Sequence, residues 1–231
     1  MYFSQFLVMW TMLNYFQELD GWNKYEIGFM YGNWLVSYGL IIFFFGGVRD
    51  FTWVIYDGDF DLIMVRPHNL LLQVISGRME LMAWAHFSFG ALVFFYCLFN
   101  LGIDLAFVDI LRILNIVFTG VFIQGGMLLF FATLSFWMIQ TGPFFGLFMS
   151  LNAYYLIFPI TAYGNYVRMV FTIIPLGFIT YFPVSWFLGK DIPFTGGDVL
   201  ANYSLLVGIA FLLLNYFLWM LGTRHYKSVG N

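Results

Sequence analysis

The side chains best suited to chemistry are concentrated in one charged loop, residues 49–80. It contains Asp57-Gly58-Asp59-Phe60-Asp61 and then Arg66-Pro67-His68-Asn69. Carboxylates and an imidazole of this kind can serve as general acids and bases. No nucleotide-binding Gly-x-x-x-x-Gly-Lys-Ser/Thr loop, zinc-protease His-Glu-x-x-His motif or Gly-x-Ser-x-Gly elbow accompanies them in the sequence. The three histidines are scattered and Cys97 is the only cysteine, so we predict neither a catalytic site nor a metal site.

The composition shows what kind of scaffold must hold this loop. Of the 231 residues, 62% are hydrophobic, 23% are aromatic and only 9% are charged. Soluble domains carry about 25% charged residues, so this chain cannot cover a water-facing surface. We therefore expect an integral membrane protein. The formal charge of −3 and the absence of a basic face exclude a nucleic-acid partner.

Uncharged stretches of about 18 residues or more mark candidate transmembrane helices, because charges are costly in hydrocarbon. On this basis we predict an all-α, polytopic membrane protein with about six transmembrane helices in a single transmembrane domain, residues 1–231. The predicted spans are roughly residues 1–18, 27–48, 81–103, 112–138, 168–189 and 199–222.

Residues 139–167 are the ambiguous part of this division. Gln140-Thr141-Gly142-Pro143 is a turn signal, and Pro159 and Gly164 interrupt the apolar run that follows. The run is either a seventh span over 144–163 or a broken, interfacial segment along one membrane face. Six spans with both termini in the cytoplasm place six basic residues inside and three outside, whereas a seventh span leaves four inside and five outside. The positive-inside rule favours six spans.

Polar residues and closely spaced glycines also occur inside the predicted spans. The amides and hydroxyls either line a substrate path or form hydrogen bonds between helices, and we favour the second. Gly28/Gly32 and Gly142/Gly146 match the small-x-x-x-small spacing of packed helices. The polar groups are Asn33, Ser37, Asn115, Gln124, Asn202 and Asn215.

Local signals divide the charged loop into two short helices. The glycine and the acids of residues 57–61 are typical of a helix N-terminus. Pro67 disfavours helical geometry at Arg66 and fits the first turn of a second helix. From the residues alone, two interpretations stay open. The loop either lies in the headgroup region with its leucines buried, or it docks onto a soluble partner.

The same residues resemble a known family signature. Gly58-Asp59-Phe60-Asp61 followed by Arg66-Pro67-His68-Asn69-Leu70 is similar to the Gly-x-Leu/Phe-Asp and Leu-x-Arg-Pro-x-Asn-x-Leu elements of an ABC-2-type permease family once catalogued as a domain of unknown function. Phe158-Pro159 through Tyr163 resembles its Tyr-Pro-x-x-x-Tyr element, and residues 172–189 resemble its proline-punctuated fifth span. Phe60 and Phe158 stand where Leu and Tyr are commoner. Family members usually begin with an amphipathic helix, which is not visible after Met1.

This resemblance implies the permease subunit of an ATP-driven exporter in the plasma (inner) membrane of a bacterium. It implies no cofactor and no enzymatic activity in this chain, because ATP and Mg would be bound by two copies of a separate ATPase. A second permease chain, identical or homologous, would complete the transporter. The charged loop would supply the cytoplasmic coupling helices between spans 2 and 3. The residues expected to couple to the ATPase are Asp57, Gly58, Asp59, Phe60, Asp61, Arg66, Pro67, His68 and Asn69.

Two further expectations concern motion and cargo. Pro175 and Pro183 remove backbone donors from the predicted span 168–189, so we expect them to bend it. The many Phe, Tyr and Met side chains suit a hydrophobic, lipid-like or peptide cargo. Reversing the charge of Asp61 or Arg66 is expected to impair association with the ATPase or its stimulation without affecting membrane insertion.

Two other classes of function remain open at this stage. The chain could be a structural or assembly subunit of a membrane complex with no transport path of its own. It could also be an intramembrane enzyme, in which Asp57, Asp59, Asp61 and His68 are the polar groups available. Copurification of an ATPase with a Walker motif would distinguish the exporter from both.

Overall fold

The computed structural model describes residues 2–16, 18–138, 141–154, 156–192 and 196–226, and this part of the chain is helical apart from one short β-hairpin. The prediction of an all-α protein is confirmed. The elements of the first half are α1 (Tyr2–Phe16), β1 (Glu18–Leu19), β2 (Trp22–Asn23), α2 (Lys24–Arg49), α3 (Phe51–Tyr56), α4 (Asp59–Met64), α5 (Leu70–Ser76) and α6 (Ala83–Asn100). Those of the second half are α7 (Phe107–Leu134), α8 (Gly142–Tyr154), the 3-10 helix η1 (Ile160–Ala162), α9 (Asn165–Ile173), the 3-10 helix η2 (Pro175–Phe178), α10 (Tyr181–Leu188), α11 (Gly197–Asn202) and α12 (Ser204–His225).

Four helical stretches are long and apolar enough to cross a membrane: α2 with α3, α6, α7 and α12. They correspond to the predicted spans 27–48, 81–103, 112–138 and 199–222. The predicted first span, 1–18, contains α1, a helix of 15 residues. At about 1.5 Å rise per residue, α1 is shorter than a bilayer's hydrocarbon core.

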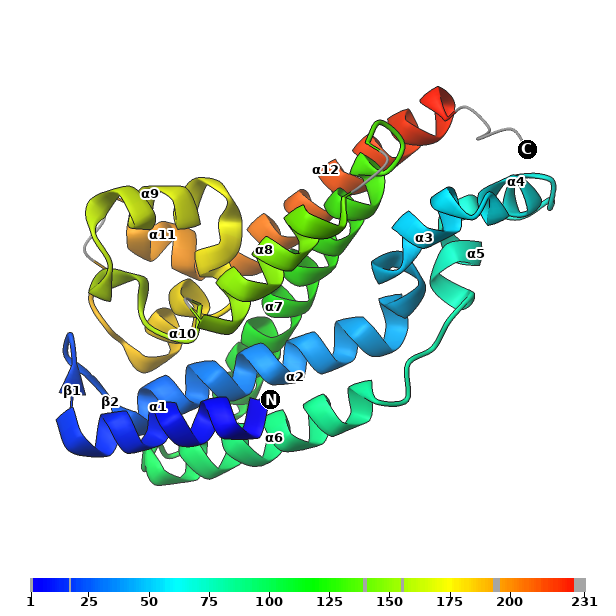
Figure 1. Ribbon diagram of the computed structural model, residues 1–231. Helices are drawn as coiled ribbons and strands as arrows, with labels where there is room; N and C mark the ends of the chain where they lie inside the picture. Colours follow the sequence, from blue (N-terminus) through cyan, green and yellow to red (C-terminus); the bar gives the residue numbers. More distant parts are fainter. Residues whose placement is uncertain (1, 17, 139–140, 155, 193–195, 227–231) are drawn as a thin grey trace.

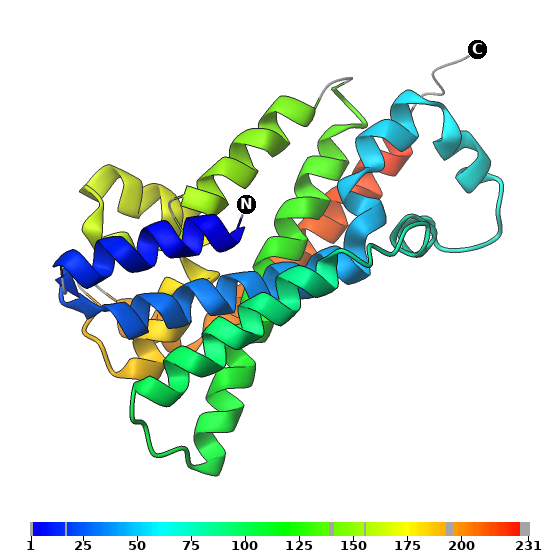
Figure 2. The same cartoon turned by 60° about the horizontal axis from the view of Figure 1, so that its bottom comes forward.

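Helix α2 forms the centre of the fold: it packs against α6 and α7, and α1 lies beside both α2 and α6 (Figures 1 and 2). Its start is fixed by a capping box, in which the Asn23 side chain accepts hydrogen bonds from the N–H groups of Tyr25 and Glu26 and the Glu26 carboxylate accepts one from the N–H of Asn23. Its path kinks at Phe45 (φ −115°, ψ 22°), directly before Gly46 and Gly47. Paired glycines are a common cause of such kinks.

Glycines bring α2 and α6 into backbone contact. A Cβ atom at Gly32 would lie 2.6 Å from the Phe94 backbone, and one at Gly39 would lie 2.6 Å from the Phe87 nitrogen. Gly90 of α6 is equally close to α2. The Gly28/Gly32 spacing therefore marks a true helix contact, whereas a Cβ on Gly142 or Gly146 would meet nothing within 4 Å.

The expectation of a single span over residues 168–189 is wrong. Helix α9 ends at Ile173, and Ile174 adopts an extended conformation (φ −83°, ψ 106°) as residues before proline prefer. Pro175 then starts η2, and α10 begins only at Tyr181. Pro175 thus breaks the segment rather than bending it. Pro183 lies in the first turn of α10, where a backbone N–H has no helical acceptor, so it causes no bend.

The described part of residues 139–167, namely 141–154 and 156–167, also differs from the expected segment along one membrane face. Helix α8 runs antiparallel to α2 and beside it. The hydroxyl of Thr141, before the start of α8, lies 2.6 Å from that of Thr52, after the end of α2, whereas Asn152 of α8 accepts a hydrogen bond from the Trp34 indole at 3.4 Å. Helix α8 therefore extends along the bundle rather than across its end.

The bundle has two distinct ends (Figures 1 and 2). At the hairpin end, β1 and β2 lie beside the start of α2, and Lys190 forms an ion pair with Glu26 at 2.9 Å. Arg112 stacks over the Trp186 ring there at 5.0 Å. At the loop end, α3, α4 and α5 project from the bundle next to the last turns of α12. The charged loop therefore lies far from the hairpin.

Candidate functional site

The charged loop folds into the two short helices expected from its sequence, α4 and α5, after α3 has extended α2 by one turn and a half. Gly58 adopts φ +77°, a conformation that glycine tolerates best, and this turns the chain into α4. The Asn69 side chain accepts a hydrogen bond from the Leu72 N–H at 3.2 Å and so caps α5. Pro67 lies in the break between α4 and α5 rather than in the first turn of α5, where it was expected.

An aromatic contact attaches α4 to the bundle. Phe60 is completely buried, and its ring centroid lies 5.2 Å from that of Phe51, 5.5 Å from Phe136 and 4.9 Å from Tyr226. These partners belong to α3 and to the ends of the α7 and α12 regions. Phe60 therefore holds the loop in place and does not present a surface to a partner.

Helix α5 is attached to α2 by a close backbone approach. A Cβ atom at Gly47 would overlap the carbonyl oxygen of Val74, and one at Gly46 would lie 3.1 Å from the carbonyl oxygen of Arg78. Val74 itself is 3% exposed. Because only glycine leaves room for this contact, α5 packs directly against the backbone of α2.

Four charged side chains tie the end of α2 to the chain between α5 and α6. Arg49 pairs with Asp50 at 2.9 Å and with Glu80 at 2.5 Å, and Asp50 also pairs with Arg78 at 2.6 Å. We call these four residues the ion cluster. Each pair is partly exposed, so each adds at most about 1 kcal/mol, but the shared partners join the end of α2 to the chain before α6.

The tip of the loop is open to its surroundings. Asp57, Asp59, Arg66, Pro67, His68 and Asn69 are exposed, and Asp61 is half-buried. Three apolar side chains share this tip: Leu62 is 63% exposed, Val65 81% and Leu72 63%. The tip thus exposes both apolar and charged side chains, while the base of the loop is packed against the bundle.

The nine residues expected at the coupling site therefore serve two different roles in the fold. Gly58, Phe60 and Asn69 shape and anchor the loop, and the other six lie at or near its tip. Sequence reasoning missed the pairing of the ion cluster and the seat at Gly46-Gly47. The Gly46-Gly47 pair near Arg49 and Asp50 marks this region in the sequence, but the sequence does not show which residues contact it.

The described residues contain no group of three or more His, Cys, Asp or Glu side chains that could hold a metal ion. Cys97 is buried between α2 and α6, with its sulfur close to Gly28. The polar groups inside the bundle form hydrogen bonds between segments: Gln124 donates to the Ser37 hydroxyl at 2.6 Å, and Asn33 donates to the Ile179 carbonyl oxygen at 2.9 Å.

Comparison with known families identifies the kind of protein that carries this loop. A family profile described as ABC-2 family transporter protein matches residues 1–230. The chain belongs to the ABC-2 transporter family. No curated protein and no solved structure gives a significant match. As an ABC-2 family member, the chain is a membrane transport subunit that is not itself catalytic. The resemblance noted in the charged loop is thereby confirmed over nearly the whole chain.

Proposed function

We propose that this chain is the membrane-spanning permease subunit of an ATP-driven exporter for a hydrophobic, lipid-like or peptide substrate. Two copies of a separate ATPase bind ATP and Mg, and a second permease chain, identical or homologous, completes the transport path. The observation that carries this proposal is the charged loop, whose base is fixed to the bundle while its tip is exposed.

The charge of the tip favours a protein partner over the membrane surface. Asp57, Asp59, Asp61 and Arg66 give residues 57–66 a formal charge of −2. Segments that lie on membranes are usually rich in Lys and Arg, because the cytoplasmic leaflet is anionic. An acidic tip with exposed Val65 and Leu72 suits a protein surface better.

The way the loop is held suggests how it acts. Closure of the ATPase pair on ATP pushes on α4 and α5. Because α5 is seated on Gly47 and the ion cluster links Arg49 to Glu80, the displacement passes to α2. Helix α2 is the most buried of the long helices, so it transmits the motion to α6 and α7 rather than into lipid.

In this proposal the loop end faces the cytoplasm, because the ATPase that it receives binds ATP there. Arg49, Arg66, Arg78 and Arg224 belong to the loop end, and Lys24, Arg112 and Lys190 to the hairpin end. Arg168 donates hydrogen bonds to the carbonyl oxygens of Thr161 and Tyr163 and lies near Tyr181, which packs against Trp22 of the hairpin, so the described basic residues divide four and four between the two ends. In this proposal both termini face the cytoplasm, and the protein resides in the plasma membrane of a bacterium.

Site-specific crosslinking tests this proposal. Cys97 is replaced by Ala, and a single cysteine is introduced as Val65→Cys at the loop tip or as Leu105→Cys at the hairpin end, both exposed positions. In native membranes, a cysteine crosslinker is expected to join Val65→Cys to an ATPase that carries a Walker motif. Leu105→Cys is expected to give no such product. Absence of the ATPase from the Val65→Cys product would contradict the proposal.

A further inference from the structure

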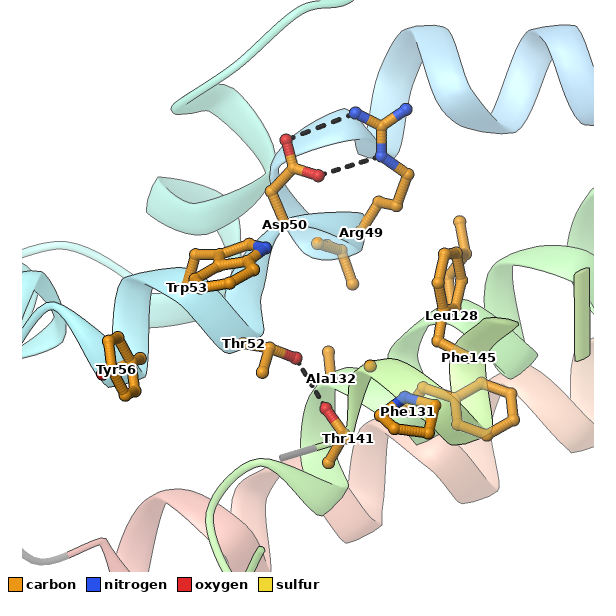
Figure 3. Close-up of a pocket in the computed structure, with 13 residues that line it drawn as sticks. Arg49, Asp50, Thr52, Trp53, Tyr56, Leu128, Phe131, Ala132, Thr141 and Phe145 are labelled. Atoms are coloured by element: carbon orange, nitrogen blue, oxygen red, sulfur yellow. Dashed lines mark hydrogen bonds and ion pairs between the residues drawn. The ribbon is translucent and has the colours of Figure 1, made fainter. Parts of the chain in front are cut away.

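A cavity of about 490 Å³ lies at the loop end between α2 with α3, α7 and the start of α8 (Figure 3). This volume is in the range of sites for small molecules, roughly 300–1,000 Å³. The side chains of its wall come from helices that are fixed to one another by the Thr52–Thr141 hydrogen bond, so the cavity is a built feature of the fold.

One side of the cavity is polar and carries no net charge. Arg49 and Asp50 are the charged residues of the lining, and they pair with each other at 2.9 Å. The hydroxyls of Thr52 and Thr141 lie 2.6 Å apart, and both are within hydrogen-bond distance of the buried Ser135 hydroxyl, at 2.9 and 3.1 Å. This side therefore offers a dipole and hydroxyls, but no uncompensated charge.

Another part of the wall is apolar. Leu128 and Ala132 of α7, 2% and 3% exposed, form this wall together with Phe131 and with Phe145 of α8. Phe131 also lines a second cavity of about 390 Å³ on the other face of α8, whose walls are almost entirely apolar. The first cavity thus combines a polar part of its wall with an apolar part.

The cavity lies near the headgroup level of the membrane. Trp53, Trp84 and Trp137, each more than half exposed, mark the loop end, and exposed tryptophans settle at headgroup level. Arg49 and Asp50 precede Trp53 by four and three residues, which is about one helical turn. The cavity therefore lies near the boundary between the headgroups and the acyl chains, where an amphiphile presents both a polar and an apolar part.

We propose that this cavity binds a single-chain amphiphile whose headgroup is polar but has no net charge. The head lies against Arg49, Asp50 and the hydroxyls of Thr52 and Thr141, and the chain lies on Leu128, Ala132 and Phe131. A headgroup with net charge leaves that charge partly desolvated without a counter-ion, because the Arg49–Asp50 pair is already neutral. Only the assignment of this amphiphile as cargo rests on the proposed function; its binding does not.

Photolabelling in membranes tests the site. The probe is a lysophosphatidylcholine with a photoactivatable acyl chain, and mass spectrometry locates the label on the full-length chain. Labelling is expected on residues 128–132 and 143–148. Unlabelled lysophosphatidylcholine should compete about tenfold better than lysophosphatidylglycerol of equal chain length, a factor that corresponds to about 1.4 kcal/mol. Equal competition by the two lipids overturns the headgroup assignment, and labelling outside these ranges overturns the site.

Two variants with matched controls separate binding from general damage. Ala132→Trp fills the cavity, whereas Ala85→Trp adds the same ring at an exposed position of α6. Thr52→Val removes a cavity hydroxyl without changing its shape, whereas Thr11→Val removes one that bonds only to its own helix, at Leu7 and Val8. Labelling is expected to fall about tenfold in Ala132→Trp and severalfold in Thr52→Val, and to stay unchanged in the controls. Wild-type labelling of a folded Thr52→Val protein overturns the role of the hydroxyls.

Addition of ATP and Mg to membranes that also contain the ATPase distinguishes the two sources of such an amphiphile. Labelling that falls during ATP hydrolysis identifies the amphiphile as cargo, and labelling insensitive to ATP identifies a resident bilayer lipid. Both results support the cavity as the binding site. If no ATPase associates with the chain, the proposed function fails while the labelling result stands, so the two failures are distinguishable.

Discussion

Helices α2 and α12 are both long and apolar, yet they occupy opposite environments. An 18-residue window of α12 has a mean hydropathy of 2.1, and 22% of this window is buried inside the protein. The corresponding window of the α2–α3 stretch has a lower mean hydropathy, 1.5, and is 83% buried. In a membrane protein the more apolar helix faces lipid, because lipid accepts apolar side chains as readily as the protein interior does.

Small and polar residues, rather than apolar ones, account for the difference. Helix α2 carries Gly32, Gly39 and Gly47, at each of which another segment comes too close for a side chain. Helix α12 instead exposes Leu206 and Leu213, each about 60% exposed. The following predictions test this contrast, beginning with the largest expected effect.

The largest effect is expected for Gly32→Leu. The new side chain collides with the backbone of Phe94, which cannot rotate away as a side chain can. We expect a loss of stability of about 3 kcal/mol or more, the upper range for overpacked sites, or failure to fold. Gly146→Leu on α8 is the control, since a Cβ there meets nothing within 4 Å. Monodispersity after solubilisation and SDS-induced unfolding measure both variants, and similar behaviour of the two would refute the α2–α6 contact.

An intermediate effect is expected from truncating the same side chain on the two helices. Leu35 of α2 is fully buried, so Leu35→Ala is expected to lower the free energy of unfolding by about 2–4 kcal/mol. Leu213 of α12 is 60% exposed, so Leu213→Ala is expected to change it by less than about 0.5 kcal/mol. SDS titration of the two purified variants provides both values. Equal losses would show that α12 is as tightly packed as α2, for instance against a second permease chain.

The smallest effect is expected where a hydrogen bond joins α7 to α2. Gln124→Leu removes the bond from the Gln124 amide to the Ser37 hydroxyl and is expected to cost about 1 kcal/mol. Thr223→Val on α12 removes a hydroxyl that bonds only to the Met220 carbonyl oxygen of its own helix, and it should be neutral. The same SDS titration compares them. A transport defect in Gln124→Leu without loss of stability would instead place Gln124 in a substrate path.

Much of this architecture was predictable from the sequence because charge is scarce in it. The uncharged runs predicted the helices now seen as α2, α6, α7 and α12. The glycine and acids of residues 57–61, together with Pro67, predicted the two short helices of the charged loop. These features depend on neighbours in the chain, which is why a single sequence contains them.

Other features depend on partners far away in the chain and could not be predicted. The pairing of Arg49 with Glu80 and the seat of Val74 on Gly47 require the three-dimensional arrangement. We predicted a single span over residues 168–189 because the segment is apolar. An apolar segment can equally form short helices joined by breaks, as this one does. Pro175 was correctly noted, but whether a proline bends or ends a helix depends on what replaces the lost backbone hydrogen bond.

The central claim is that the tip of the charged loop receives the ATPase, and one measurement tests it most directly. The ATPase activity of the assembled complex in proteoliposomes is compared for Val65→Asp at the loop tip and Leu105→Asp at the hairpin end, both exposed apolar positions. Placing a charge among exposed apolar contacts at an interface costs about 2 kcal/mol or more, so Val65→Asp should reduce complex formation or stimulated hydrolysis by at least about tenfold. Leu105→Asp should behave as the unmodified protein does. Normal stimulation in a folded Val65→Asp protein would contradict the account.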